Sequence, residues 1–174
     1  HEYFHTIQFA YRCGAGINAY FYELTSTWIE DLGYPDINDY LNFMVSSNSY
    51  KNYYKYPDQD FDDTNGYSVA LFGHYLSTQL ENQEGIEYDN EFSSLVMNKI
   101  WDRLENTSST AIAAIDHILE SEYGTNFNNA WVDFNTRNLF NQIDESKYYY
   151  EDQSLLSKII IDDYTLLDDN SDNI

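Results

Sequence analysis

Cysteine, basic residues and long apolar runs are scarce in this sequence of 174 residues, and each shortage excludes a class of protein. The single cysteine, Cys13, excludes a disulfide framework and any zinc site built from several cysteines. Eight basic residues stand against thirty acidic ones, for a formal charge of −22. Such a chain has no basic face for phosphates, so a nucleic-acid partner is not expected. No apolar run approaches the roughly 20 residues that cross a bilayer, so no membrane span is expected either.

The composition that remains is that of a folded protein. Hydrophobic residues make up 43% of the chain and aromatic residues 18%, which is too much for a disordered protein. The length suits one domain, or part of one, with a core of its own. Apolar residues recur at helical spacing through most of the chain, which predicts a mainly α fold. The expected helices cover residues 1–12, 17–31, 37–46, 67–82 and 91–105, then a sixth helix up to Gly124 and a seventh after Asn126.

Turn and capping residues set the expected ends of these helices. Gly14-Ala15-Gly16 breaks the first helix, and Asp36 is the expected N-cap of the third. Ser108 or Ser109 is expected to cap the sixth helix, and Asn126 the seventh. The apolar stripes that should face the core are Val69, Phe72, Leu76 and Leu80, then Phe92, Val96, Ile100 and Leu104, then Phe127, Trp131 and Phe134.

Two other stretches have a different character. Residues 47–66 read as a long polar loop rich in tyrosine, asparagine and aspartate. After residue 150 the segment 158–167 is β-branched and compact, which predicts a short strand or an extended tail. We therefore expect a helical portion over residues 1–150 and a tail or linker over residues 151–174.

The first five residues carry the most informative motif, His1-Glu2-Tyr3-Phe4-His5, which is H-E-x-x-H. Histidines at positions i and i+4 project from one face of a helix, so His1 and His5 can hold one zinc ion between them. Glu2 is then placed to take a proton from a water bound to the metal. The alternative is a helix that carries two unrelated histidines.

A third ligand is expected because a catalytic zinc takes three protein ligands and leaves a position open. Glu23 lies 18 positions after His5, across the glycine turn, on a second helix that can pack beside the first. Tyr20, Leu24 and Trp28 give it largely apolar surroundings. This favours a ligand over the alternative, a solvated glutamate on an amphipathic helix.

The motif and the helical glutamate together resemble the gluzincin group of zinc metallopeptidases, which includes the thermolysin-like enzymes. The stretch 23–31, Glu-Leu-Thr-Ser-Thr-Trp-Ile-Glu-Asp, followed by Asn38-Asp39-Tyr40, is similar to a family of predicted secreted metalloproteases from bacteria. That family has an E-G-T-A-x-W-M-E-D stretch and an N-D-Y segment. Weaker likenesses follow in the same order at 67–76, 100–103 and 130–135, so the resemblance covers roughly residues 1–150.

This resemblance implies a zinc site made of His1, His5 and Glu23, with Glu2 as general base, in a secreted, extracellular protein. Two positions depart from the related patterns. Thermolysin-like enzymes carry an aspartate four residues after the third ligand to orient a histidine, where this chain has Thr27. Glu30 or Asp31 could take that role. The bacterial family has glycine after the third ligand, where this chain has Leu24.

The resemblance also implies an upstream partner. Peptidases of this group bind an extended substrate along a sheet edge that precedes the first motif helix. We therefore expect the chain to be the helical C-terminal portion of a zincin-type catalytic domain, with an upstream segment of the same domain as its partner. The helical portion by itself could hold the metal ligands and still be inactive.

Peptide hydrolysis further needs a donor for the charge that develops on the scissile carbonyl oxygen. Tyr67, His74 and His117 are the candidates, and Tyr67 comes first because it opens a helix after an acidic loop, as in the family pattern. An ordinary buried tyrosine is the alternative for Tyr67. For His117 we expect a structural role on a packed helix.

Two acidic runs could bind calcium, at 58–66 and at 168–173. The first has oxygen ligands at alternating positions, but it lacks the glycine at the sixth position and the glutamate at the twelfth position of an EF-hand loop. The alternative is a solvated acidic loop, and for the second run a linker.

The sequence therefore predicts a zinc-dependent peptidase, a secreted endopeptidase acting on protein or peptide substrates. A second hypothesis is a non-catalytic binding module, or pseudoenzyme, that retains the site and binds glycans or peptides through its tyrosine-rich loop. A third is a zinc hydrolase that acts on another substrate.

Overall fold

The computed structural model describes residues 1–34, 36–45, 60–81, 94–140 and 155–156. The fold is mainly α, as predicted, and no strand occurs in these described ranges. The strand expected at 158–167 and the proposed boundary at residue 150 lie outside them. None of the described helices combines the length and the apolarity that crossing a membrane requires.

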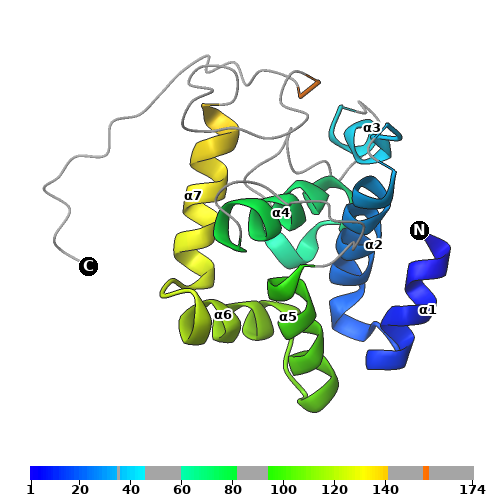
Figure 1. Ribbon diagram of the computed structural model, residues 1–174, viewed down its shortest axis with the longest axis vertical. Coiled ribbons are helices and arrows are strands. Elements are labelled where there is room, and N and C mark those ends of the chain that lie inside the picture. The colour runs from blue at the N-terminus through cyan, green and yellow to red at the C-terminus, as the bar shows by residue number, and fades with distance from the viewer. Residues whose placement is uncertain (35, 46–59, 82–93, 141–154, 157–174) are drawn as a thin grey trace, which may run out of the picture.

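The helices follow the order expected from the sequence (Figure 1). The N-terminal part consists of α1 (Glu2–Tyr11), the 3-10 turn η1 (Gly16–Asn18), α2 (Ala19–Gly33) and α3 (Asp39–Val45). The middle part consists of η2 (Phe61–Asp63), η3 (Tyr67–Val69), α4 (Ala70–His74) and the π-helical η4 (Tyr75–Glu81). The last part consists of α5 (Leu95–Asn106), α6 (Ala111–Glu122) and α7 (Phe127–Leu139).

The third and the sixth helix begin later than predicted, and the local backbone conformation and capping explain this. The third helix begins at Asp39 rather than after Asp36, because Asn38 takes a left-handed conformation with φ 49°. The cap of α6 is Thr110 rather than Ser108 or Ser109, since its hydroxyl accepts from the Ala113 N–H. The helix expected over 67–82 changes from 3-10 to α to π geometry along its length. Asn126 caps α7 as predicted, because its side chain accepts from the Asn129 N–H.

Helix α2 lies at the centre of the N-terminal half and contacts α1, α3 and α4. Its contact with α4 is close because Gly73 has no side chain: a Cβ there would come within 2.8 Å of the Trp28 ring. The Trp28 indole N–H donates to the Ser77 hydroxyl at 3.2 Å. This contact fixes the direction of α2, which carries the candidate third ligand.

Aromatic rings fill the core between α4 and α7. Phe72, which is fully buried, makes edge-on contacts with four rings and stacks on Tyr75. The four rings belong to Phe61, Phe127, Trp131 and Phe134. The stripes predicted on α4, α5 and α7 face the core, with Leu80, Phe127 and Trp131 only partly buried. Phe92 lies outside the described residues.

Polar contacts tie the N-terminal helices to each other and to α6. The Tyr22 hydroxyl donates to the Arg12 carbonyl at 2.6 Å, and the Arg12 guanidinium donates to the Ser109 carbonyl at 2.8 Å. The buried Asn18 side chain accepts from the Ala111 N–H at 2.8 Å. These bonds fix the turn between α1 and α2, and therefore how the two helices face each other.

Candidate metal centre

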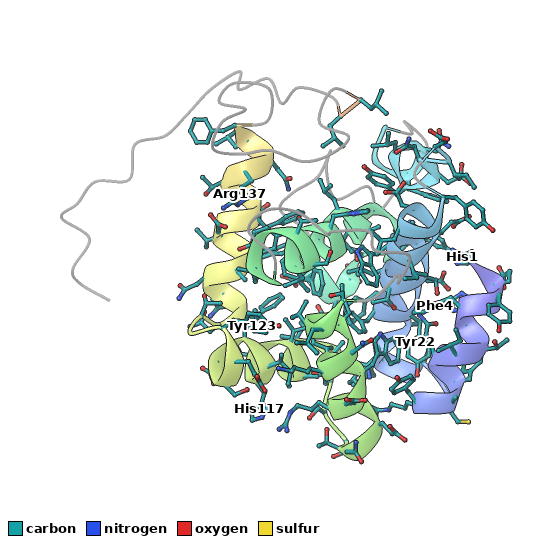
Figure 2. The ribbon with its side chains drawn as sticks, viewed as in Figure 1. His1, Phe4, Tyr22, His117, Tyr123 and Arg137 are labelled. Carbon is teal, nitrogen blue, oxygen red and sulfur yellow. The ribbon has the colours of Figure 1, made fainter. Side chains whose placement is uncertain are left out.

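His1, His5 and Glu23 meet where α1 packs beside α2. Figure 1 shows these two helices, and Figure 2 labels His1 at the start of α1. One ligand atom from each of the three side chains lies within 4.8 Å of the other two, although the three span 22 positions of the chain. The His1 Nε2 lies 3.1 Å and the His5 Nε2 3.6 Å from the Glu23 carboxylate. The two imidazole rings are edge-on with centroids 4.9 Å apart. Among the described residues, no other three His, Cys, Asp or Glu side chains converge in this way.

A second set of side chains holds the outer nitrogens of both imidazoles. The His1 Nδ1 lies 3.3 Å from the Glu30 carboxylate, one of the two residues proposed to orient a histidine. The His5 Nδ1 lies 2.7 Å from the Gln8 Oε1 and 3.2 Å from the Ser26 hydroxyl. Metal-bound histidines are commonly held by such partners on the nitrogen that does not face the metal.

The three side chains therefore suit a zinc ion chemically. Two imidazole nitrogens and a carboxylate oxygen are the donor set of many catalytic zinc sites. The cluster is partly buried rather than sealed, with side-chain exposures of 16% for His1, 17% for His5 and 30% for Glu23. A metal held by these three side chains would keep a position open for water or substrate.

Tyr67 lies beside this cluster. Its ring stacks on His1 with centroids 5.6 Å apart and on Phe43 with centroids 4.5 Å apart. Partial burial raises the pKa of the Tyr67 phenol, and its hydrogen bond to Glu23 and the charges of Glu23, Glu2 and Glu30 raise it further. The phenol is therefore protonated at neutral pH and available as a hydrogen-bond donor.

Gly66 brings Tyr67 against α2. Its φ of 86° is in the left-handed region, and a Cβ on Gly66 would collide with the Tyr20 carbonyl and lie 2.7 Å from the Glu23 Cβ. The absence of a side chain therefore lets the segment before η3 touch the backbone of α2 beside the third candidate ligand.

A cleft and a groove border the cluster. A cleft of about 430 Å³ is lined by Glu2, His5, Glu23 and Tyr67, and it continues along Thr6, Phe9, Ala15, Ala19 and Tyr22. Glu2 is exposed and faces this cleft without joining the cluster of ligand atoms. A groove of about 790 Å³ borders His1 and Glu30, with mostly apolar walls from Tyr3, Phe4, Ile7, Ile29, Tyr34 and Ile37.

The other two candidate donors lie away from the cluster. His74 is largely buried, with 12% of its side chain exposed, and pairs with Asp31, whose carboxylate lies 3.3 Å from its Nε2. Asp31 therefore faces His74, and it is Glu30 that lies beside His1. His117 is exposed on α6, away from α1 (Figure 2). The structural role expected for His117 on a packed helix is thus not evident, because its ring faces solvent.

The buried His74 gives a testable pH dependence. Burial lowers the pKa of His74 to about 4, although the Asp31 carboxylate opposes this shift. The unfolded chain protonates the imidazole near pH 6.5, so it binds more protons than the folded chain as the pH falls from about 6.5 to 4. Above about pH 6.5 His74 does not contribute to the pH dependence of the free energy of unfolding. Within it we expect the free energy of unfolding to fall by at most about 1.4 kcal/mol per pH unit on account of His74.

Denaturant unfolding of the wild type and of His74→Gln at about pH 7 and pH 5 measures this contribution, since other titrating groups are common to both proteins. The wild type should lose more free energy of unfolding than the variant between the two pH values. Equal losses of free energy of unfolding in the two proteins would show that Asp31 cancels the effect of burial on the pKa of His74.

Four residues that contact the cluster or its neighbours were not predicted: Gln8, Ser26, Gly66 and Phe43. Gln8 sits on the same helical face as His1 and His5, so helical spacing could have identified it. Nothing in the sequence indicates that Gly66 touches α2 or that Phe43 stacks on Tyr67, because both contacts depend on how distant segments pack. The described part of the first acidic run, residues 60–66, brings no three ligand side chains together. Calcium binding there and at 168–173 stays a prediction.

Compared with known protein families, with curated proteins and with solved structures, the chain shows no significant match.

Proposed function

We propose that this protein is a zinc-dependent peptidase, with His1, His5 and Glu23 as metal ligands and Glu2 as general base. The observation that carries the proposal is the convergence of the three side chains within 4.8 Å, with the exposed Glu2 carboxylate in the adjoining cleft. Neither part alone would suffice, since acidic groups are common on protein surfaces and H-E-x-x-H can arise by chance.

Each residue has a distinct role in this proposal. When bound, zinc polarises the scissile carbonyl and lowers the pKa of a water molecule. Glu2 takes the proton from the attacking water and passes it to the leaving amine. The Tyr67 hydroxyl donates a hydrogen bond to the carbonyl oxygen as negative charge develops on it. Glu30 keeps the His1 imidazole in place through its Nδ1.

The surroundings of the cluster favour a peptide as substrate. His1 borders the apolar groove, and Glu2 and His5 border the cleft, so there is space beside the cluster for the side chains of a peptide. The walls offer apolar side chains rather than the basic groups that a phosphate or sulfate ester would need. Secretion, which the motif resemblance suggests, belongs to the same proposal.

Metal analysis tests the ligand set first. Protein purified without added metal is expected to contain about one zinc per chain by plasma mass spectrometry. His5→Ala removes one of three ligands and should lose that zinc, whereas His117→Ala, which removes an exposed histidine outside the cluster, should retain it. Zinc that is absent from the wild type, or retained in His5→Ala, would contradict the proposed site.

Peptide cleavage tests the reaction. The zinc-loaded full chain is expected to cleave members of a mixed peptide library, and a chelator should abolish that cleavage. A protein that binds zinc at these three residues but cleaves no peptide would be a binding module, a hydrolase of another substrate, or the helical portion of a catalytic domain that needs its upstream segment for activity.

A further inference from the structure

Gln8 lies between α1 and α2 and is almost completely buried, with 1% of its surface exposed. Its amide nitrogen lies 2.9 Å from the Tyr22 carbonyl and 2.8 Å from the Thr25 hydroxyl. Its amide oxygen lies 2.7 Å from the His5 Nδ1. All three polar contacts of this buried amide are therefore within the protein.

The orientation of the Gln8 amide follows from its partners. The Tyr22 carbonyl can only accept a hydrogen bond. The Thr25 hydroxyl uses its single proton on the Phe21 carbonyl, 2.9 Å away, so it too accepts from Gln8. Both amide N–H groups of Gln8 are thus committed to α2. The reversed amide would place its oxygen against two acceptors in a buried position, which is costly.

The Gln8 oxygen must consequently accept, and among the described residues the donor within hydrogen-bond distance of it is His5. A neutral imidazole carries one N–H, on either nitrogen. The bond to Gln8 requires that N–H at Nδ1, and the lone pair is then at Nε2, which faces Glu23 at 3.6 Å. Ser26 does not decide between the two forms, because its hydroxyl can donate or accept.

We propose that Gln8 is a positioning residue that fixes His5 in the Nδ1–H tautomer, through an amide locked onto the backbone and side chain of α2. The importance of Gln8 for metal binding rests on the proposed function, because only a metal at the cluster uses the Nε2 lone pair. The tautomer of His5 does not depend on the proposed function, since it is a property of the metal-free protein. Gln8 thus links the packing of α1 against α2 to the tautomer of one candidate ligand, His5.

The test compares Gln8→Met with a matched control. Methionine keeps the length of the side chain but cannot accept the His5 proton or donate to α2. Asn18→Leu removes a second buried amide, also 1% exposed, which bonds the Ala111 N–H and touches none of the three ligands. Both variants lose buried hydrogen bonds, so a merely structural effect should appear in both.

Two measurements are made on all three proteins. Long-range ¹H–¹⁵N correlation of histidine-labelled protein, stripped of metal at about pH 8.5, reads the tautomer of each neutral imidazole. Competition with a chromogenic chelator gives the dissociation constant for zinc. We expect the Nδ1–H form of His5 in the wild type and in Asn18→Leu, and its loss in Gln8→Met. Zinc binding should weaken about 10–100-fold in Gln8→Met, with little change in Asn18→Leu.

The inference is overturned if wild-type His5 carries its proton on Nε2, or if Gln8→Met keeps the Nδ1–H form. It is also overturned if both variants weaken zinc binding equally. A wild type that shows the Nδ1–H form but binds no zinc would overturn the proposed function and confine Gln8 to setting the tautomer.

Discussion

Replacing Glu2 with glutamine is expected to lower the turnover number for peptide hydrolysis by about 10²–10⁴-fold while the protein keeps its zinc. Glutamine has nearly the same shape but cannot take up the proton of the attacking water. Glu2 is exposed, lines the cleft and is not among the converging ligand atoms, so neither folding nor metal binding should depend on its charge.

The measurement pairs steady-state cleavage of a peptide with zinc content on the same sample. Glu120→Gln is the matched control, because it makes the same chemical change at an exposed position of α6. Glu120→Gln should change neither the turnover number nor the zinc content. Equal turnover in Glu2→Gln and the wild type would remove Glu2 from the mechanism. Loss of zinc in Glu2→Gln would mean that Glu2 is a ligand.

Gly66→Ala is expected to destabilise the protein by about 2–5 kcal/mol and to weaken zinc binding at the same time. The residue has φ 86°, which costs a non-glycine residue about 1–2 kcal/mol. Its new methyl group would also collide with the Tyr20 carbonyl and crowd the Glu23 side chain, and such overpacking costs about 1–3 kcal/mol. Relief of this collision requires η3 and α2 to separate, which would move Tyr67 and Glu23 apart.

Gly14→Ala separates the conformational cost of a positive φ from the cost of the collision with α2. Gly14 has a nearly identical φ of 88°, but a Cβ there would meet nothing within 4 Å. We therefore expect Gly14→Ala to carry only the conformational cost, about 1–2 kcal/mol by denaturant unfolding, with zinc affinity unchanged. Equal losses of stability in the two variants would show that the contact between Gly66 and α2 is unimportant.

Much of the helical architecture could be predicted because local chemistry decides it. The stripe Val96, Ile100 and Leu104 on α5 and the cap Asn126 on α7 depend on residues a few positions apart. The predicted cap of the sixth helix failed where a longer-range contact competed. Thr110 caps α6 although two serines precede it, and Ser109 is instead held by its carbonyl against Arg12 from α1.

The candidate site likewise has a part that local sequence decides and a part that depends on how the helices pack. A single helix fixes the relation between His1, Glu2 and His5, because its period brings positions i and i+4 to one face. The sequence alone therefore determined which residues could bind a metal and which carboxylate lies next to them. Glu23 was predicted from its spacing and neighbours, but whether it faces the histidines depends on how α2 packs against α1.

Only the tertiary structure decided the rest of the site. It chose Glu30 rather than Asp31 for His1, placed His74 against Asp31, and stacked Tyr67 on His1 through the close approach of Gly66. It also committed both N–H groups of Gln8 to α2, which leaves its oxygen for His5. The physical reason is that these contacts join segments 14 to 66 positions apart, and their geometry depends on packed side chains and shared hydrogen bonds that no local pattern encodes.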